Sequence, residues 1–192
     1  MPETFRRDLL AATVAEIADS GEFILRAYCA ELESALGERT VVTASVPAGL
    51  LLVLTAAGVG PAYPVHLADG VRPAVAGVLR RLNVALVSVE EADCHIADHP
   101  DDPDQLLVAR AGRPGVVVID LGPSSRWAGV TVAAAVRTSD ADLAERVRWL
   151  RNHGQDGRTR FLHQLVGFNA RMDEIAAAYL LRVHFSGEDG RR

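Results

Sequence analysis

The stretch "LRNHGQDGRTRFLHQLVGFNARMDEIAAAYL", residues 150–180, decides how the rest of the chain is interpreted. It starts at the end of an amphipathic helical pattern that stops at Gly154, and it leads into an alanine-rich helix expected over about residues 172–184. Between these helices lies Gly167-Phe168-Asn169-Ala170-Arg171, which sets two polar side chains in a turn just before the last helix.

The composition predicts one globular domain. The chain has 192 residues, of which 49% are hydrophobic and 23% charged, so it can bury a sizeable core, and we expect a single shortened domain over residues 1–192 with a polar tail from 185. The net charge of −5 gives no electrostatic reason to bind nucleic acid or an anionic membrane. The apolar runs are too short to cross a bilayer and the N-terminus lacks the apolar core of a signal peptide, so we expect a cytoplasmic protein.

The basic residues are unusual because all 20 Lys+Arg positions are arginine. Without a lysine side chain, these residues cannot hold an aldehyde cofactor as an internal Schiff base. The cysteines, Cys29 and Cys94, are too few for a disulfide framework and match no zinc motif. We therefore expect a reducing compartment.

Apolar patterning predicts an alternation of strands and helices, and hence an α/β fold with a mainly parallel sheet flanked by helices. Helices are expected over residues 6–19, 24–36, 48–57, 71–82 and 140–153, and strands over 40–45, 63–67, 84–89, 106–110, 115–121 and 129–138. Ser139 is the expected N-cap of the fifth helix. The acidic segment 90–105 is expected to be an exposed loop, and the turn 112–115 a tight reversal between strands.

The segment beginning TSDADLAERVRWLRNHG closely resembles the DegT/StrS family of pyridoxal-phosphate-dependent aminotransferases over about residues 130–184. ADSGEFI, VVTASVPAGLLLVLTAAGVG and VALVSVEEAD resemble the N-terminal part of that family in the same order. The family makes amino sugars and related natural-product building blocks. The resemblance implies a reduced aspartate-aminotransferase-type large domain (fold type I) that lacks a stretch between about residues 105 and 115 and the small domain after residue 185.

The resemblance also locates the family's cofactor residues. Its phosphate-binding Ser-Gly-Thr turn corresponds to Ser45-Val46-Pro47, which adds bulk and loses a backbone donor. Counting back from AAAVRTSD places Arg126 where the Schiff-base lysine would lie, and arginine cannot take that role. The acidic partner of the pyridinium nitrogen falls in the missing stretch. We therefore expect no cofactor, with covalent pyridoxal phosphate excluded, and no transamination by this chain alone.

The Asn169–Arg171 motif does match the family, in whose dimers the corresponding residues reach the cofactor phosphate of the neighbouring subunit. Two interpretations stay open: the turn builds a dimer interface, or Asn169 and Arg171 still bind an anion across one. The expected partners are a small-molecule substrate and a second subunit, either identical or a related aminotransferase.

Other polar residues have two interpretations each. His66, inside an apolar strand, is either a core histidine or a general base. Ser124 and Ser125 beside Arg126 either bind an anion or form a polar turn. His95 and His99 are four residues apart but lie in the segment expected to be a loop, so no metal site is predicted.

Two functions follow from these patterns. The first is a cofactor-independent enzyme of natural-product biosynthesis that performs a cyclisation, dehydration or isomerisation in the inherited pocket. The second is a non-catalytic partner of a full-length family aminotransferase. For the first, the expected catalytic residues are Arg126, His66 and Asp120, and the expected anion-binding residues are Ser45, Ser124, Ser125, Asn169 and Arg171.

Overall fold

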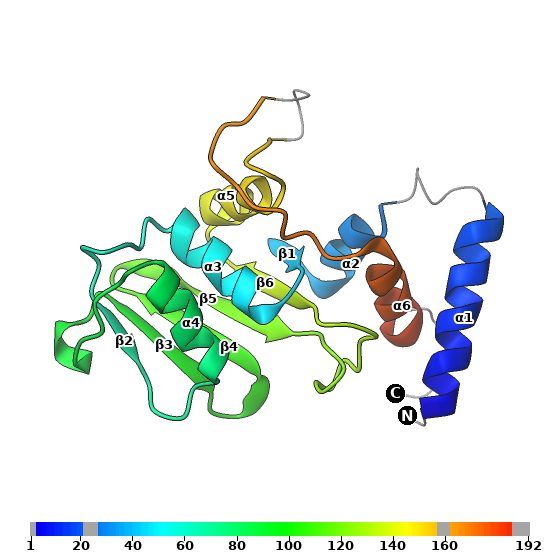
Figure 1. Cartoon of the computed structure of the whole chain (residues 1–192), viewed down its shortest axis with the longest axis horizontal. Helices are drawn as coiled ribbons and strands as arrows, with labels where there is room; N and C mark the ends of the chain where they lie inside the picture. The colour runs from blue at the N-terminus through cyan, green and yellow to red at the C-terminus, as the bar shows by residue number, and fades with distance from the viewer. Residues whose placement is uncertain (1–2, 21–26, 157–161, 186–192) are drawn as a thin grey trace.

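The computed structural model describes residues 3–20, 27–156 and 162–185, which form a six-stranded sheet with helices on both faces. The strands lie in the order β1-β6-β5-β4-β3-β2 (Figure 1). The elements are α1 (Glu3–Ser20), α2 (Tyr28–Leu36), β1 (Thr40–Thr43), α3 (Val46–Ala56), β2 (Val65–Leu67), α4 (Pro73–Arg81), the short 3-10 helix η2 (Val89–Glu91), β3 (Cys94–His99), β4 (Asp102–Arg110), β5 (Arg113–Asp120), β6 (Ala134–Thr138), α5 (Ala141–Arg151) and α6 (Glu174–His184).

The strand pairing is mixed rather than mainly parallel. Only β2 and β3 pair in parallel, whereas β1–β6, β6–β5, β5–β4 and β4–β3 are all antiparallel. The tight β4–β5 hairpin, with Gly112 at a φ of +65°, accounts for part of this difference, because a hairpin reverses the chain within the sheet. That hairpin was predicted from the turn residues, but its consequence for the whole sheet was not.

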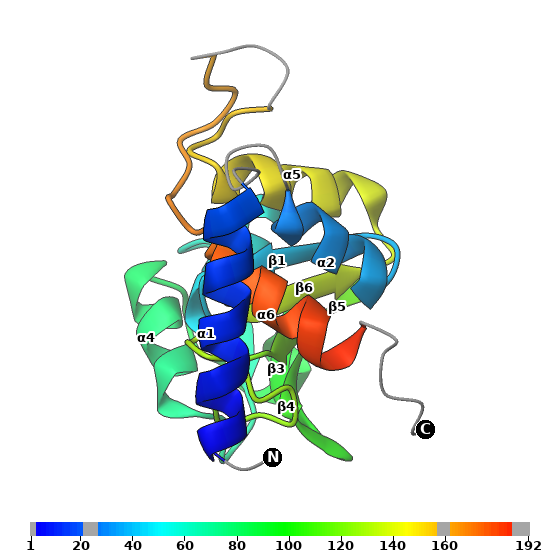
Figure 2. The same ribbon diagram turned by 90° about the vertical axis from the view of Figure 1, so that its right-hand side faces the viewer.

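Alternating apolar residues divide the core between the two faces of the sheet. One face buries β-strand residues such as Val41, Ile96 and Val118 against α3, α4 and α5. The other face buries Val42 and Ile119 against α2 and α6 near β1, β6 and β5, and α1 lies outside α6 (Figures 1 and 2). The second core therefore covers only the half of its face that β1, β6 and β5 form.

Side-chain caps fix the starts of three helices. Ser45 Oγ accepts a hydrogen bond from the Ala48 N–H at 3.2 Å at the start of α3. At α5 the cap is Asp140, which accepts from the Leu143 N–H at 3.0 Å, so the prediction of Ser139 was wrong by one residue. Asp173 caps α6 in the same way.

Two predicted segments differ from the structure. Residues 84–89 form no extended strand and contribute an isolated bridge between Leu86 and Val65. The segment predicted as a loop over 90–105 instead contains β3 and the start of β4. Cys94 and Ile96 are fully buried in the core, and this burial outweighs the acidic and proline residues around them. In the described part of the chain, no helix is long and apolar enough to span a membrane.

Candidate functional site

The turn at Ser45 lies beside the segment that carries Asn169 and Arg171. The Ala44 N–H donates to the Ala170 carbonyl at 3.0 Å, and the Ala170 N–H donates to the Arg151 carbonyl at 3.0 Å. This segment is thus held between β1 and the end of α5. Both polar side chains are exposed and make no hydrogen bond or ion pair with residues that the structure describes.

Two glycines allow that segment to pack closely against the end of α5. A Cβ added at Gly154 would lie 1.8 Å from the Leu165 carbonyl oxygen, and one added at Gly167 would lie 2.1 Å from the Gly154 nitrogen. Gly154 also has a φ of +78°. Only glycine fits at either position, so the backbone ahead of Asn169 is closely constrained.

Asp120 lies at the same end of the sheet as Ser45. It ends β5 and is paired with Ala134 of β6, which is paired in turn with Thr43 of β1. Two strand spacings place the Asp120 and Thr43 backbones about 10 Å apart. The Asp120 carboxylate already accepts the Gly122 N–H at 2.9 Å and forms an ion pair with Arg72 at 3.3 Å.

Arg126, in the loop after β5, is also ion-paired. Its guanidinium lies 2.9 Å from the Asp102 carboxylate, and its backbone N–H donates to Asp104 at 2.8 Å. More than half of the side chain, 57%, remains exposed. Both aspartates lie at the start of β4, so Arg126 connects this end of the β3–β4 hairpin to the loop after β5.

Arg72 completes this cluster and was not found from the sequence. It donates to the Pro103 carbonyl at 2.6 Å and forms an ion pair with Asp98 at 3.4 Å, in addition to its contact with Asp120. Its partners are 26 or more residues away in sequence, so no local pattern marks it. The signal that was present is the excess of aspartates over 98–104, which need counter-charges in the folded chain.

The two serines near Arg126 differ. Ser125 is buried, its Oγ donates to the Gly122 carbonyl at 2.8 Å, and it accepts the Trp127 N–H at 3.2 Å. Its hydroxyl therefore holds the turn together, which is the second of its two interpretations. Ser124 is exposed beside it.

His66, one of the two residues predicted as a general base, lies away from this cluster. It lies on β2, and the register through Ile96 and Val108 places the neighbouring Leu67 level with Val116, near the start of β5. Asp120 is at the other end of β5. Three strand spacings and several residues along the sheet separate His66 from Asp120 by at least ~15 Å.

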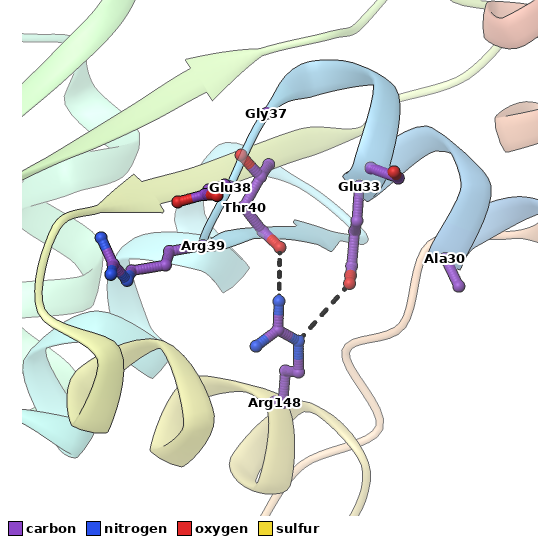
Figure 3. Close-up of a pocket in the computed structure, with 8 residues that line it drawn as sticks. Ala30, Glu33, Gly37, Glu38, Arg39, Thr40 and Arg148 are labelled. Atoms are coloured by element: carbon purple, nitrogen blue, oxygen red, sulfur yellow. Dashed lines mark hydrogen bonds and ion pairs between the residues drawn. The ribbon is translucent and has the colours of Figure 1, made fainter.

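Two surface cavities flank a charged network on the outer edge of β1. Glu33 accepts the Val42 N–H at 3.0 Å and pairs with Arg151 at 2.5 Å and Arg148 at 3.5 Å, and the arginines donate to the carbonyls of Val42 and Thr40. Figure 3 shows Arg148 between Glu33 and Thr40 in the first cavity, of about 290 Å³. The second, of about 320 Å³, lies around Arg148, Arg151, Asn152, Gln155 and Arg171.

The cysteines are poor nucleophiles. Burial raises the pKa of the Cys94 thiol to about 11. Burial, followed by the charge of Glu174, raises the pKa of Cys29 further still. Both thiols are therefore protonated at neutral pH. Within the described ranges, no group of three or more metal-ligating side chains could hold a metal ion.

Sequence comparison supports the resemblance on which the cofactor positions were assigned. Residues 132–185 match the model of the DegT/DnrJ/EryC1/StrS aminotransferase family. Over these residues the chain is similar to aminotransferases of that family. It is 34% identical over 125 residues to dTDP-3-amino-3,4,6-trideoxy-alpha-D-glucose transaminase of Streptomyces venezuelae, covering 51% of this chain and 32% of the relative. It is 35% identical over 111 residues to the erythromycin biosynthesis sensory transduction protein EryC1 of Saccharopolyspora erythraea, covering 45% and 30%. The chain thus spans about a third of the length of each.

Solved structures confirm the fold class. An aminotransferase of this family from Brucella abortus superposes with a TM-score of 0.74 at 22% identity, over 92% of this chain and 63% of that one. NtdA from Bacillus subtilis superposes with a TM-score of 0.72 at 16% identity, over 92% of this chain and 52% of that one. The fold is therefore a reduced aminotransferase large domain with a mixed sheet.

The prediction of no cofactor is contradicted by these comparisons. The NtdA structure has bound pyridoxamine phosphate, and a GDP-4-keto-6-deoxymannose-3-dehydratase with the same fold (TM-score 0.70, 12% identity, over 91% of this chain and 64% of that one) holds a pyridoxal phosphate–glutamate geminal diamine. Nothing in the relatives points to a loss of the cofactor.

The residues of this chain alone do not fit a covalently held cofactor, however. Ser45 Oγ is engaged by Ala48, and Pro47 has no N–H to offer a phosphate. Asp120 and Arg126 are both ion-paired within the chain, and these 192 residues contain no lysine. Asn169 and Arg171, like Ser124, are exposed polar residues of the predicted site without a hydrogen bond or ion pair to the described residues.

Proposed function

We propose that this chain is the partner of a lysine-bearing family aminotransferase and supplies Asn169 and Arg171 to a pyridoxal phosphate site across their interface. The substrate class we infer is an amino-sugar precursor, because one of the similar proteins is a dTDP-amino-sugar transaminase. In this proposal the lysine, and with it the covalent chemistry, come from the other subunit.

The observation that carries the proposal is that Asn169 and Arg171 combine a fixed backbone with exposed side chains. The backbone between them is held by hydrogen bonds to β1 and α5, while both side chains are exposed and make no hydrogen bond or ion pair with the described residues. An amide N–H and a guanidinium are suitable donors for phosphate oxygens. Ordering the backbone in advance lowers the entropic cost of such contacts.

The ion pairs around Arg72 and Arg126 support the same assignment. Arg72 and Arg126 neutralise Asp98, Asp102 and Asp120 internally, so the acidic groups near the former lysine position already have counter-charges. When bound, pyridoxal phosphate supplies the electron sink for amino-group transfer. The role that fits this chain is to bind and orient the phosphate of a cofactor held elsewhere.

Co-expression with a lysine-bearing aminotransferase of the family from the same genome tests the proposal. We expect the two chains to co-purify, and Asn169→Ala to weaken retention of pyridoxal phosphate by the complex about tenfold, the cost of one hydrogen bond to a charged group. Ser139→Ala, an exposed change far from the motif, is the matched control.

Failure to form a complex would rule the proposal out. So would a complex in which Asn169→Ala retains the cofactor as well as Ser139→Ala does. Absorbance of the bound aldimine after desalting measures retention, and light scattering after size exclusion measures the composition of the complex.

A further inference from the structure

The histidine excluded from the site above is paired with another one. His66 of β2 lies directly opposite His95 of β3 in the parallel register, and their ring centres are 5.8 Å apart at an interplanar angle of 55°. Neither ring forms a hydrogen bond with a described residue, and no nitrogen of either is among the buried unpaired atoms. Both rings therefore keep a nitrogen lone pair available when neutral.

The two histidines lie on strands that are packed against the hydrophobic core. Of the four residues that flank the two histidines on their strands, Val65, Cys94 and Ile96 are fully buried in the core, and Leu67 packs against it. Because side chains alternate along a strand, His66 and His95 project from the opposite face. In that region the described residues provide no helix over β2, β3 and β4, since α2 and α6 cover the sheet near β1, β6 and β5 (Figure 2).

The spacing of the rings suits one metal ion between them. Metal–nitrogen bonds of ~2.1 Å, with about 1.1 Å more to each ring centre, place two ligating imidazole centres roughly 5–6 Å apart. The observed separation of 5.8 Å falls within this range without any change of the backbone. Imidazole is a preferred ligand of Zn²⁺, Ni²⁺ and Cu²⁺, and two such ligands leave the other positions to water.

We propose that His66 and His95 form a two-histidine site for a divalent transition metal on the open face of the sheet, where the ion links β2 to β3. The site is separate from the cofactor region, because His66 lies at the opposite end of the sheet from Asp120. It does not depend on the proposed partner function.

Titration calorimetry with Ni²⁺ on protein without a histidine tag tests the site. We expect one ion per chain, and a loss of affinity of about a hundredfold or more in His66→Ala and in His95→Ala, because one ligand alone lacks the gain of the second, intramolecular bond. His99→Ala is the matched control, since His99 is on the same strand as His95 and its ring already accepts the Asp101 N–H.

A spectroscopic readout makes the test independent of the folding of the variants. With one equivalent of Cu²⁺ on the wild-type protein, the electron paramagnetic resonance spectrum should show coupling to two imidazole nitrogens. Equal affinity of His66→Ala and the wild type would overturn the proposal, and so would coupling to a single nitrogen or to none.

Discussion

Replacing Glu33 by alanine should destabilise the protein, because it removes the carboxylate at the centre of the charged network on the outer edge of β1. Its side chain is 11% exposed and joins α2 to β1 and α5 through the Val42 N–H at 3.0 Å, Arg151 at 2.5 Å and Arg148 at 3.5 Å. Removal leaves the Arg151 guanidinium, itself 15% exposed, without its carboxylate. Breaking a buried ion pair costs about 3–5 kcal/mol, and partial exposure puts this pair near ~3 kcal/mol.

Urea unfolding followed by circular dichroism measures the effect. For a chain of this length, ~3 kcal/mol corresponds to a fall in Tm of roughly 6–12 °C. Glu33→Gln should lose less, about 1–2 kcal/mol, because an amide oxygen can still accept the Val42 N–H. Glu38→Ala, an exposed change on the same cavity, should stay within about 0.5 kcal/mol.

The reasoning would be refuted if Glu33→Ala unfolded at the same urea concentration as Glu38→Ala. That result would mean that the network between α2, β1 and α5 contributes nothing measurable to stability. The outer edge of β1 would then be held by packing alone.

Three further changes test the thiols, the glycine turn and the former lysine position. Burial raises the pKa of Cys94 from its ordinary 9.0 to about 11. The contribution of this thiol to the free energy of unfolding should therefore be complete below pH 9 and fall towards pH 11. Cys94→Ala should flatten that fall in unfolding curves measured at different pH. Gly154→Ala should cost more than ~2 kcal/mol of unfolding free energy, since the left-handed backbone alone costs about 1–2, whereas Gly60→Ala, which meets nothing within 4 Å, should cost little. Arg126→Lys should trap pyridoxal phosphate on borohydride reduction no better than Arg113→Lys, because the new amine would pair with Asp102 as Arg126 does. Trapping by Arg126→Lys alone would contradict this reasoning.

Much of the fold could be predicted from local patterns. The apolar spacing located the helices within a few residues, and the turn at Gly112 identified the β4–β5 hairpin. The pairing direction of the other strands could not be predicted, because it depends on which strands become neighbours. β3 was missed since its acidic residue Asp98 finds a counter-charge in Arg72, which is distant in sequence.

The arrangement of the candidate site also depends on strand pairing, which the sequence does not reveal. Ser45 and Asn169 were predicted as anion-binding residues and Asp120 as a catalytic residue. The register of β1, β6 and β5, together with the Ala44–Ala170 hydrogen bond, brings their backbones to one end of the sheet. His66 was misplaced because a position along a strand does not reveal the end of the sheet to which it belongs. Family motifs locate residues along the chain, whereas register decides which of them meet.

Native mass spectrometry of this chain co-expressed with a lysine-bearing aminotransferase of the family tests the central claim most directly. The account predicts a mixed dimer that carries pyridoxal phosphate, and loss of that cofactor when Asn169 and Arg171 of this chain are both replaced by alanine. Separate, unmixed dimers, or a mixed dimer that keeps its cofactor after the double replacement, would contradict it.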